Sequence, residues 1–462
     1  MEIVLSTAHW IYLAIIVFII FLMVIKKDIV FPSILGVLVV GLIYSGGNIV
    51  FSLQSIFRSM VVAGQNLFDI LLVISLMVGL TTSLGKIGAD TMMISPAAKL
   101  IKSPNMAFWV IAGVMYIAAL FFWPSPAMAL VAIVLIPVAL KVGIRPVMAA
   151  SAASIAGYGM ALSQDIVIQG APSISAAASG VPISSIIFYS TIFSFATGIT
   201  ALIITFIINR KKMGIEKSDI AAMEKSEGAA IEKVEKAAPN KYAKFFAIGV
   251  PIVLLVIVVN IIAGGIIGRE ATALLGGTAA LIIFAASLAE GRDNFLRSSV
   301  ESLREGFMFS LRVFGPVIPI AGFFMMGAPA HSVSILGEGA PGFLFDLSTA
   351  LAYSLPLSPA PIAIGTLFIG VLTGLDGSGF SGLPLVGALA ANLAMVSNLS
   401  PAILVALGQV GAVFSGGGAL VAWAIAHVAG FCGVSANDIV RKNFGPVLVG
   451  FGVALAIAIV LL

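Results

Sequence analysis

Long runs of apolar residues, separated by short polar or glycine-rich stretches, cover most of this chain. Charged side chains are absent from whole segments such as 183–209 and 245–268. A helix of about 20 apolar residues is long enough to cross the hydrocarbon core of a bilayer, and a helix satisfies its own backbone hydrogen bonds there. The pattern therefore predicts an all-α polytopic membrane protein.

The order of helices, prolines and glycines occurs twice along the chain. With an offset of 255 residues, 143–160 aligns with 398–415, and Pro146 falls on Pro401. Several such matches follow one another in the same order, which indicates an internal repeat. We therefore predict a first repeat at 1–209 and a second repeat at 244–462, related by inverted topology.

Each predicted repeat contains a hairpin and a broken helix. The hairpins, at about 106–141 and about 361–396, have short arms and tips rich in Pro, Gly and Ser. The broken helices are expected at about 146–180 and about 401–432. Irregular backbone at membrane depth is tolerated only where it is buried in protein or lines a wet cavity, which favours re-entrant hairpins. Full double crossings are the alternative.

The topology follows from the number of crossings and from the basic residues. About five transmembrane helices per repeat is an odd number, so the second repeat is inserted upside down. Lysines and arginines are enriched in cytoplasmic loops. If the charged linker 210–243 is cytoplasmic, the extracytoplasmic segments hold Arg58, Arg269 and little else that is basic. The sequence thus predicts a multi-pass protein of the cell (cytoplasmic) membrane with both termini outside.

Composition excludes several classes of function. The chain has 462 residues, of which 60% are hydrophobic and 10% charged, whereas a soluble protein carries about 25% charged residues. The net charge of +4 reflects where lysines sit relative to the membrane, and we expect no nucleic-acid partner. Cys432 is the single cysteine, and His9, His331 and His427 lack metal-ligand spacing. No cofactor or metal site is expected.

Two acidic residues fall in the predicted breaks. Asp376 lies in the hairpin tip "GLDGSGFSGLP", and Asp165 lies in the broken-helix stretch "GYGMALSQDIVIQGAPS". An acidic side chain at membrane depth is by default a functional hypothesis. We predict that both residues couple transport to a sodium ion or a proton. The alternative for each is a helix cap or a water-exposed helix end.

Small polar residues and glycines at the tips and breaks are the predicted substrate contacts. Interrupted helices expose N–H groups that favour anions and C=O groups that favour cations, near the bilayer midplane. The alternative is that small residues serve helix packing. The candidate substrate-binding residues are Ser125, Ser163, Gln164, Ser378, Ser381, Ser415, Gly416 and Gly417.

This order of elements resembles the ion transporter superfamily, which includes divalent-anion/sodium symporters, gluconate permeases and several sodium/proton antiporters. The stretch "KSPNMAFWVIAGVMYIAALFFWPSPAMALVAIVLIPVALKVGIRP" is similar to the hairpin region of the DcuC-type four-carbon dicarboxylate carriers. The resemblance implies secondary transport by an elevator-like movement of the hairpins and broken helices against a scaffold. The tip sequence Trp-Pro-Ser-Pro departs from related families, and the Ser-Asn-Thr signature of the divalent-anion symporters is missing, so the substrate is left open.

Three functional hypotheses follow. The first is a secondary active transporter, such as a symporter, that moves a small organic anion (a carboxylate or dicarboxylate) with sodium or protons. The second is a sodium/proton antiporter on the same fold, favoured by the scarcity of basic residues at the predicted site. The third is an intramembrane serine protease that uses Ser381 of "GFSG" and His427 of "AHVAG". We expect a transporter and not an enzyme, in contact with the lipid bilayer, and by analogy with elevator proteins a homodimer.

Overall fold

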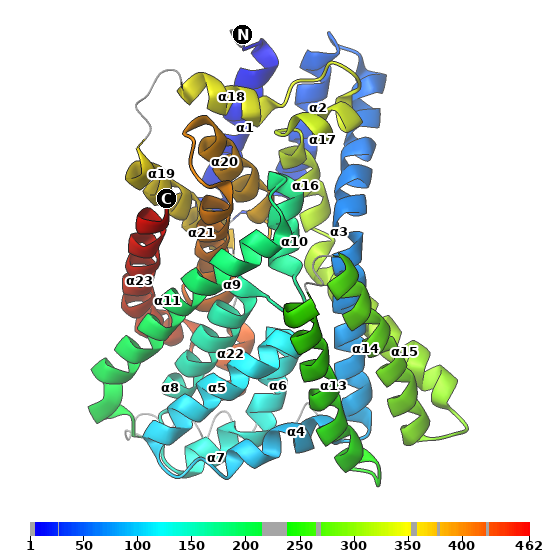
Figure 1. Ribbon diagram of the computed structural model, residues 1–462, viewed down its shortest axis with the longest axis vertical. Coiled ribbons are helices and arrows are strands. Elements are labelled where there is room, and N and C mark those ends of the chain that lie inside the picture. The colour runs from blue at the N-terminus through cyan, green and yellow to red at the C-terminus, as the bar shows by residue number, and fades with distance from the viewer. Residues whose placement is uncertain are drawn as a thin grey trace.

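The computed structural model describes residues 5–25, 27–214, 238–264, 269–352, 358–376, 379–421 and 425–462. All regular elements in these segments are helices, and their one β-pairing is an isolated bridge between Ile144 and Gly214. The predicted all-α fold is therefore confirmed. Figure 1 shows the helices as one elongated bundle with the N-terminus at one end.

One side of the bundle is formed by the first helices of each half. These are α1 (Thr7–Val24), α2 (Val30–Tyr44) and α3 (Ile49–Lys86), and α13 (Ala243–Gly264), α14 (Arg269–Glu290), α15 (Phe295–Phe314) and α16 (Val317–Met325). In Figure 1 the long helix α3 runs along this side, with α2 and α16 against its upper part and α14 and α15 against its lower part. We call this group the outer helices.

Helices α3 and α15 cross closely because small residues face each other. A Cβ atom on Gly306 would lie 1.9 Å from the carbonyl oxygen of Ser75, so only glycine fits at this crossing. The Ser75 and Ser310 hydroxyls are 2.6 Å apart. Small residues let membrane helices approach closely and gain van der Waals contact.

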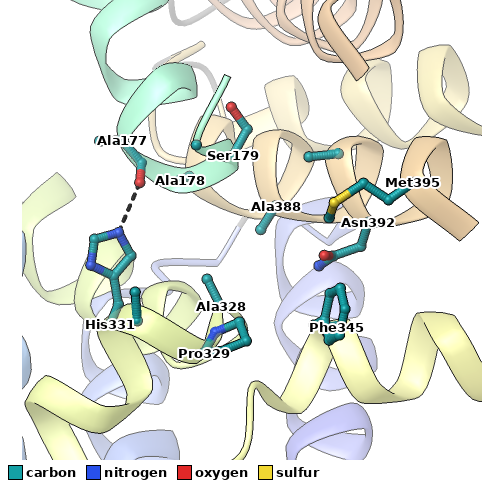
Figure 2. Close-up of a pocket in the computed structure, with 13 residues that line it drawn as sticks. Ala177, Ala178, Ser179, Ala328, Pro329, His331, Phe345, Ala388, Asn392 and Met395 are labelled. Atoms are coloured by element: carbon teal, nitrogen blue, oxygen red, sulfur yellow. Dashed lines mark hydrogen bonds between the residues drawn. The ribbon is translucent and has the colours of Figure 1, made fainter. Parts of the chain in front are cut away.

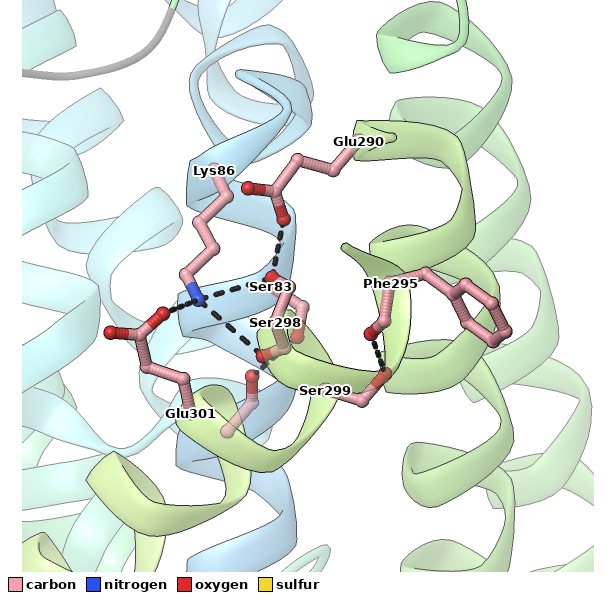
Figure 3. A network of polar contacts seen from close by, with 8 residues as sticks. Ser83, Lys86, Glu290, Phe295, Ser298, Ser299 and Glu301 are labelled. Carbon is pink, nitrogen blue, oxygen red and sulfur yellow. Dashed lines mark hydrogen bonds and ion pairs between the residues drawn. The ribbon is translucent and has the colours of Figure 1, made fainter. Parts of the chain in front are cut away.

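A polar cluster joins the far end of α3 to α14 and α15 (Figure 3). The Lys86 ammonium lies 3.2 Å from the Glu301 carboxylate and 3.2 Å from the Ser298 hydroxyl. The same Ser298 hydroxyl donates to Glu290. Because Lys86 and Glu301 are both partly exposed, we expect this ion pair to contribute only about 0–1 kcal/mol.

The rest of the first half contains a short helix, the predicted hairpin, its broken helix and a last long helix. In chain order they are α4 (Ala89–Ala98), α5 (Pro104–Phe122), α6 (Pro124–Val134), α7 (Ile136–Lys141), α8 (Pro146–Ala153), the π-helix η1 (Ser154–Ala161), α9 (Leu162–Gln164), α10 (Gly170–Ser179), α11 (Ile183–Asn209) and η2 (Arg210–Lys212). Trp123 alone joins α5 to α6, and residues 165–169 separate α9 from α10.

The second half follows the same order after two additional short helices. They are α17 (Pro329–Leu336) and α18 (Phe343–Ala352), then α19 (Pro359–Thr373), η3 (Gly374–Asp376), α20 (Leu383–Val396), α21 (Pro401–Val413), the π-helix η4 (Phe414–Ala419), α22 (Ala426–Cys432) and α23 (Ala436–Leu461). The inverted relation of the two halves stays a prediction.

The broken helices form the centre of the bundle. Every residue from 146 to 165 is buried, and so is every residue from 402 to 417. These stretches are rich in Ala, Gly and Ser and carry no amphipathic pattern, which is typical of a helix surrounded by protein. The buried core therefore contains the two segments in which the sequence predicts breaks.

Four described helices are long and apolar enough to cross a membrane: α5, α11, α23 and residues 270–290 of α14. Two bent pairs, within α3 and from α15 to α16, raise this number to six. The prediction of about five crossings per repeat also needs shorter apolar helices such as α1 and α2. Helix α5 has 19 residues and α6 has 11, so the first hairpin combines one full-length arm with one short arm.

Candidate functional site

The tips of the two hairpins meet in the buried centre. Trp123, at the first tip, and Phe380, at the second tip, have ring centroids 5.5 Å apart. Both side chains are buried. The backbone of Trp123 has a φ of 67° and a ψ of 147°, a conformation that residues other than glycine rarely adopt. Such strained residues cluster at functional sites. Segments about 250 residues apart in sequence are thus in direct contact.

The glycines of the second tip let its backbone lie directly against η4. A Cβ atom on Gly374 would lie 2.1 Å from the Ser415 hydroxyl oxygen, and one on Gly416 would lie 2.4 Å from the Gly374 carbonyl oxygen. Gly379 has a φ of +70° and would place a Cβ 2.9 Å from the Gly417 nitrogen. The glycine-rich tip is therefore required for close packing, whether or not it also binds a ligand.

The two π-helices also contact each other in this centre. Gly159 on η1 faces the Phe414 ring on η4, where a Cβ atom would lie 2.4 Å from a ring carbon. Single π-helical turns are rare and frequently mark functional sites, because the widened turn displaces backbone groups from the regular hydrogen-bond ladder. Both broken helices contain such a turn within the same buried volume.

The carboxylate of Asp165 closes the first break. Its oxygens accept the backbone N–H groups of Gln169 at 3.2 Å, Gly170 at 2.6 Å and Ala171 at 3.1 Å. These N–H groups begin α10, so the negative charge lies at the positive end of that helix. Asp165 is 3% exposed and has a left-handed backbone with φ of 42°. It holds the break in place, and its ion-coupling role stays a prediction.

Ser163 and Gln164 lie just before this break and are fully buried. The Ser163 hydroxyl donates to the Ser194 hydroxyl on α11 at 2.9 Å. The Gln164 amide donates to the Tyr116 hydroxyl on α5 at 2.7 Å. These contacts join α9 to its neighbours, while the buried Oε1 atom of Gln164 has no hydrogen-bond partner among the described residues. The substrate-binding role of both residues stays a prediction.

Gln409 on α21 reaches the first break from the other half of the chain. Its amide N–H group donates to the Ser163 carbonyl at 2.8 Å. Its Oε1 atom is buried and has no hydrogen-bond partner among the described residues. Sequence reasoning missed Gln409, Tyr116 and Ser194. The sequence did hold a sign of Gln409, because its amide side chain interrupts the apolar stretch 401–413.

The remaining candidates lie at the two tips and on η4. The Ser415 hydroxyl donates to the Val371 carbonyl at 3.0 Å and to the Gly411 carbonyl at 2.8 Å, and so joins η4 to α19. The Ser125 side chain interacts with Tyr158 on η1. Ser381 is buried just before α20.

Parts of the second tip lie outside what the structure describes. Ser378 is not among the described residues, and Asp376 is described only as backbone at the end of η3. The side chain of His427 is likewise outside the described part, so the Ser381–His427 dyad of a protease stays untested. The described candidates gather around the tips and the first break, at the crossing of η1 and η4.

Comparison with known proteins supports the membrane class. No model of a known protein family matches this chain. The chain is 35% identical over 466 residues to "Uncharacterized membrane protein YhfA" of Bacillus subtilis (strain 168), with 100% of both chains covered. This chain belongs to the same family as YhfA. The YhfA family is thus one of membrane proteins, in agreement with the apolar helices, and the resemblance to the ion transporter superfamily stays a prediction.

Proposed function

We propose that this YhfA-family chain is a secondary active transporter of a small organic anion, coupled to sodium or protons. The observation that carries the proposal is the meeting of two hairpin tips and two π-bulged broken helices in one buried centre. A membrane protein tolerates interrupted backbone at depth where the interruption lines a binding site or is covered by protein.

The helix ends at the tips supply the electrostatics for an anion and a cation together. Helices α6 and α20 begin at the tips, and their N-cap residues, Trp123 and Gly382, make no side-chain cap. Their positive ends favour a carboxylate. Helices α5 and α19 end at the same tips, and their negative ends favour a cation. A site bordered by positive and negative helix ends can bind an anion together with a coupling cation.

The anion would be held by backbone groups, because basic side chains are absent from this region of the sequence. Neither 146–209 nor 358–440 contains a lysine or an arginine. The N-terminus of α10 is already neutralised by Asp165, which leaves the tip helices as the available anion-binding ends. The unpaired Oε1 atom of Gln409 is an oxygen ligand for the coupling cation near the first break.

The moving part would consist of the hairpins and broken helices, and the outer helices would be the scaffold. The two groups contact each other at both ends of the bundle: α10 and α20 meet α3 and α16 toward the end that holds the N-terminus, and α4 meets α13 and α3 at the opposite end (Figure 1). An elevator-like movement would carry the tips and their ligand past the outer helices. We propose a carboxylate as the class of substrate that this movement carries.

A ligand-dependent stability measurement tests the proposal. Purified protein in detergent is heated with sodium or potassium, across pH, with mono-, di- and tricarboxylates. A ligand of the native state raises stability by about 2.7 kcal/mol at a hundredfold excess over Kd. We expect one carboxylate to raise the melting temperature, more strongly with sodium or at lower pH. Uptake of that carboxylate into proteoliposomes, driven by the same ion gradient, completes the test.

A sodium/proton antiporter is the second candidate. It is favoured by the absence of basic side chains around the tips and by the buried carboxylate of Asp165. The same measurement separates the two functions. A melting temperature that responds to sodium and pH, with no effect of any carboxylate, would contradict the anion carrier and support the antiporter.

A further inference from the structure

A cavity lies away from the hairpin tips, between α10, α17, α18 and α20. Its volume is about 230 Å³. Figure 1 places these helices toward the end of the bundle that holds the N-terminus. One face of α20 forms one wall of the cavity, with Ala388, Ala391, Asn392 and Met395. The described residues that line it include no lysine, arginine, aspartate or glutamate.

The beginning of α17 provides hydrogen-bond donors to this cavity. Helix α17 starts at Pro329, and its N-cap residue Ala328 makes no side-chain cap. Ala330 and His331, the next two residues, line the cavity. Their backbone N–H groups have no partner within the helix, because the first turn lacks preceding carbonyls. The uncapped positive end of α17 therefore borders the cavity and favours an anion.

Asn392 is an independent sign of a ligand. The residue is 5% exposed, and its side chain points into the cavity beside Phe345 (Figure 2). The structure shows no hydrogen bond from this amide to another lining residue. A buried amide without a hydrogen-bond partner costs free energy, so we expect a ligand or a water molecule to form the missing hydrogen bonds. The amide N–H groups of Asn392 can donate to the same anion as α17.

The remaining wall suits a small molecule with an apolar part. The C-terminal end of α10 would repel an anion through its carbonyl groups, but His331 Nε2 lies 3.0 Å from the Ala177 carbonyl oxygen, and the Ala176 carbonyl accepts the Gly180 N–H group at 2.9 Å (Figure 2). Phe345 and Met395 provide an apolar surface next to Asn392. The cavity is smaller than the ~300–1,000 Å³ of sites for drug-sized ligands, so it suits a small metabolite.

We propose that this cavity is a second binding site for a small carboxylate, separate from the hairpin tips. The carboxylate accepts hydrogen bonds from the Ala330 and His331 N–H groups and from the Asn392 amide, and its apolar part lies on Phe345 and Met395. The inference rests on the proposed function, because the carboxylate is the substrate class proposed for transport.

Because of the position of the cavity, a ligand bound in it would contact both the moving part and the scaffold during that transport. Helices α10 and α20 belong to the proposed moving part, and α18 packs mainly on α20, whereas α17 packs on α3 of the scaffold. A ligand in this cavity therefore bridges the moving part and the scaffold. Movement of the hairpin against α17 would separate the donors of Asn392 from those of α17, and so release the carboxylate.

Thiol protection measures occupancy of the cavity directly. The single cysteine is replaced in Cys432→Ala, and Met395→Cys then places a thiol at the cavity wall. A small maleimide is reacted with this protein in detergent, with propionate, succinate or citrate. We expect one of these carboxylates to slow labelling several-fold, and propionamide, which lacks the charge, to have no effect. Ser334→Cys, exposed on α17 outside the cavity, is the control whose labelling stays unchanged.

Two further variants in the Met395→Cys protein identify the binding groups. Asn392→Leu keeps the size of the side chain and removes the amide, so the carboxylate concentration for half protection should rise about tenfold. Ala388→Leu fills the cavity without removing a donor and should abolish protection. If Asn392→Leu does not fold, Ala388→Leu still decides the question. Unchanged protection in a folded variant, or equal protection of Ser334→Cys, overturns the inference.

The outcomes separate this inference from the transport proposal. Uptake of a carboxylate by proteoliposomes without any protection at Met395→Cys contradicts the second site and leaves transport intact. Protection that depends on Asn392, without uptake of the same carboxylate, supports the site and contradicts transport. If no carboxylate protects, stabilises or is taken up, both are wrong.

Discussion

The two broken helices at the centre of this protein are interrupted in different ways. At the first break, the Asp165 carboxylate accepts three backbone N–H groups at the start of α10. At the second, η4 lies against a hairpin tip where glycines leave no room for side chains. The first break is held by charge and hydrogen bonds, and the second by close backbone contact. The first should thus be sensitive to charge and the second to volume.

The largest expected effect comes from adding volume at the second break. Gly416→Ala would place a Cβ 2.4 Å from the Gly374 carbonyl oxygen, and backbone atoms cannot move aside as a flexible side chain can. We expect a loss of at least about 1–3 kcal/mol of stability, seen as a lower melting temperature in detergent. Gly365→Ala is the matched control, because nothing lies within 4 Å of its Cβ position. Equal melting temperatures for the two variants would contradict the packing of the tip on η4.

The next effect comes from removing the cap at the first break. Asp165→Ala leaves the N–H groups of Gly170 and Ala171 buried without an acceptor, so we expect a loss of about 1–3 kcal/mol. Asp165→Asn retains an acceptor oxygen and should lose less stability. Thermal unfolding of both variants measures this difference. If Asp165→Asn keeps stability but loses the response to sodium or pH, Asp165 also couples the ion; an unchanged response assigns it to capping alone.

A smaller effect is expected at the contact between the two halves. Gln409→Leu removes the hydrogen bond to the Ser163 carbonyl and also the unpaired Oε1 atom, at a cost of about 0.5–1.5 kcal/mol. If the Oε1 atom binds the coupling cation, the sodium concentration for half-maximal stabilisation should rise in this variant. Ser194→Ala, which removes a hydrogen bond on the other side of Ser163, is the control and should leave the sodium response unchanged. A sodium response equal to that of the unmodified protein would exclude Gln409 as a cation ligand.

The smallest effect on stability is expected at Asp376. We predict that Asp376→Asn folds with an unchanged melting temperature and abolishes ion-dependent transport, because a carboxylate at membrane depth is expected to be functional. Uptake into proteoliposomes with and without a sodium or proton gradient measures this. Unchanged ion dependence in the variant would remove Asp376 from the site. Together with Asp165→Asn, this variant decides whether the ion binds at the first break or at the second hairpin tip.

For several candidate residues, the sequence alone did not distinguish ligand binding from helix packing. Ser163 and Ser415 lie in the buried centre, as their place in the predicted breaks suggested, but their hydroxyls bond to neighbouring helices. Serine in a membrane helix has the same local pattern whether it binds a ligand or serves packing. Gln409 was missed because its role depends on reaching Ser163, 246 residues away in sequence.

The sequence by itself determined the class of the protein and the places where its helices are interrupted. Long uncharged runs require membrane helices, and local glycines and prolines such as Gly416, Gly417 and Pro401 limit where helices continue. These are properties of neighbouring residues, and they can be read without knowing the fold. The same reasoning placed Asp165 at a break but left open whether it binds an ion or caps a helix.

Only the tertiary structure decided which interrupted segments lie together and what their polar groups contact. In the folded protein Trp123 lies against Phe380, the Asp165 carboxylate accepts backbone N–H groups at the start of α10, and a cavity lies beside Asn392. Such contacts depend on how helices far apart in sequence pack against one another. Apolar periodicity shows that a helix face is buried, but it does not show which partner covers that face.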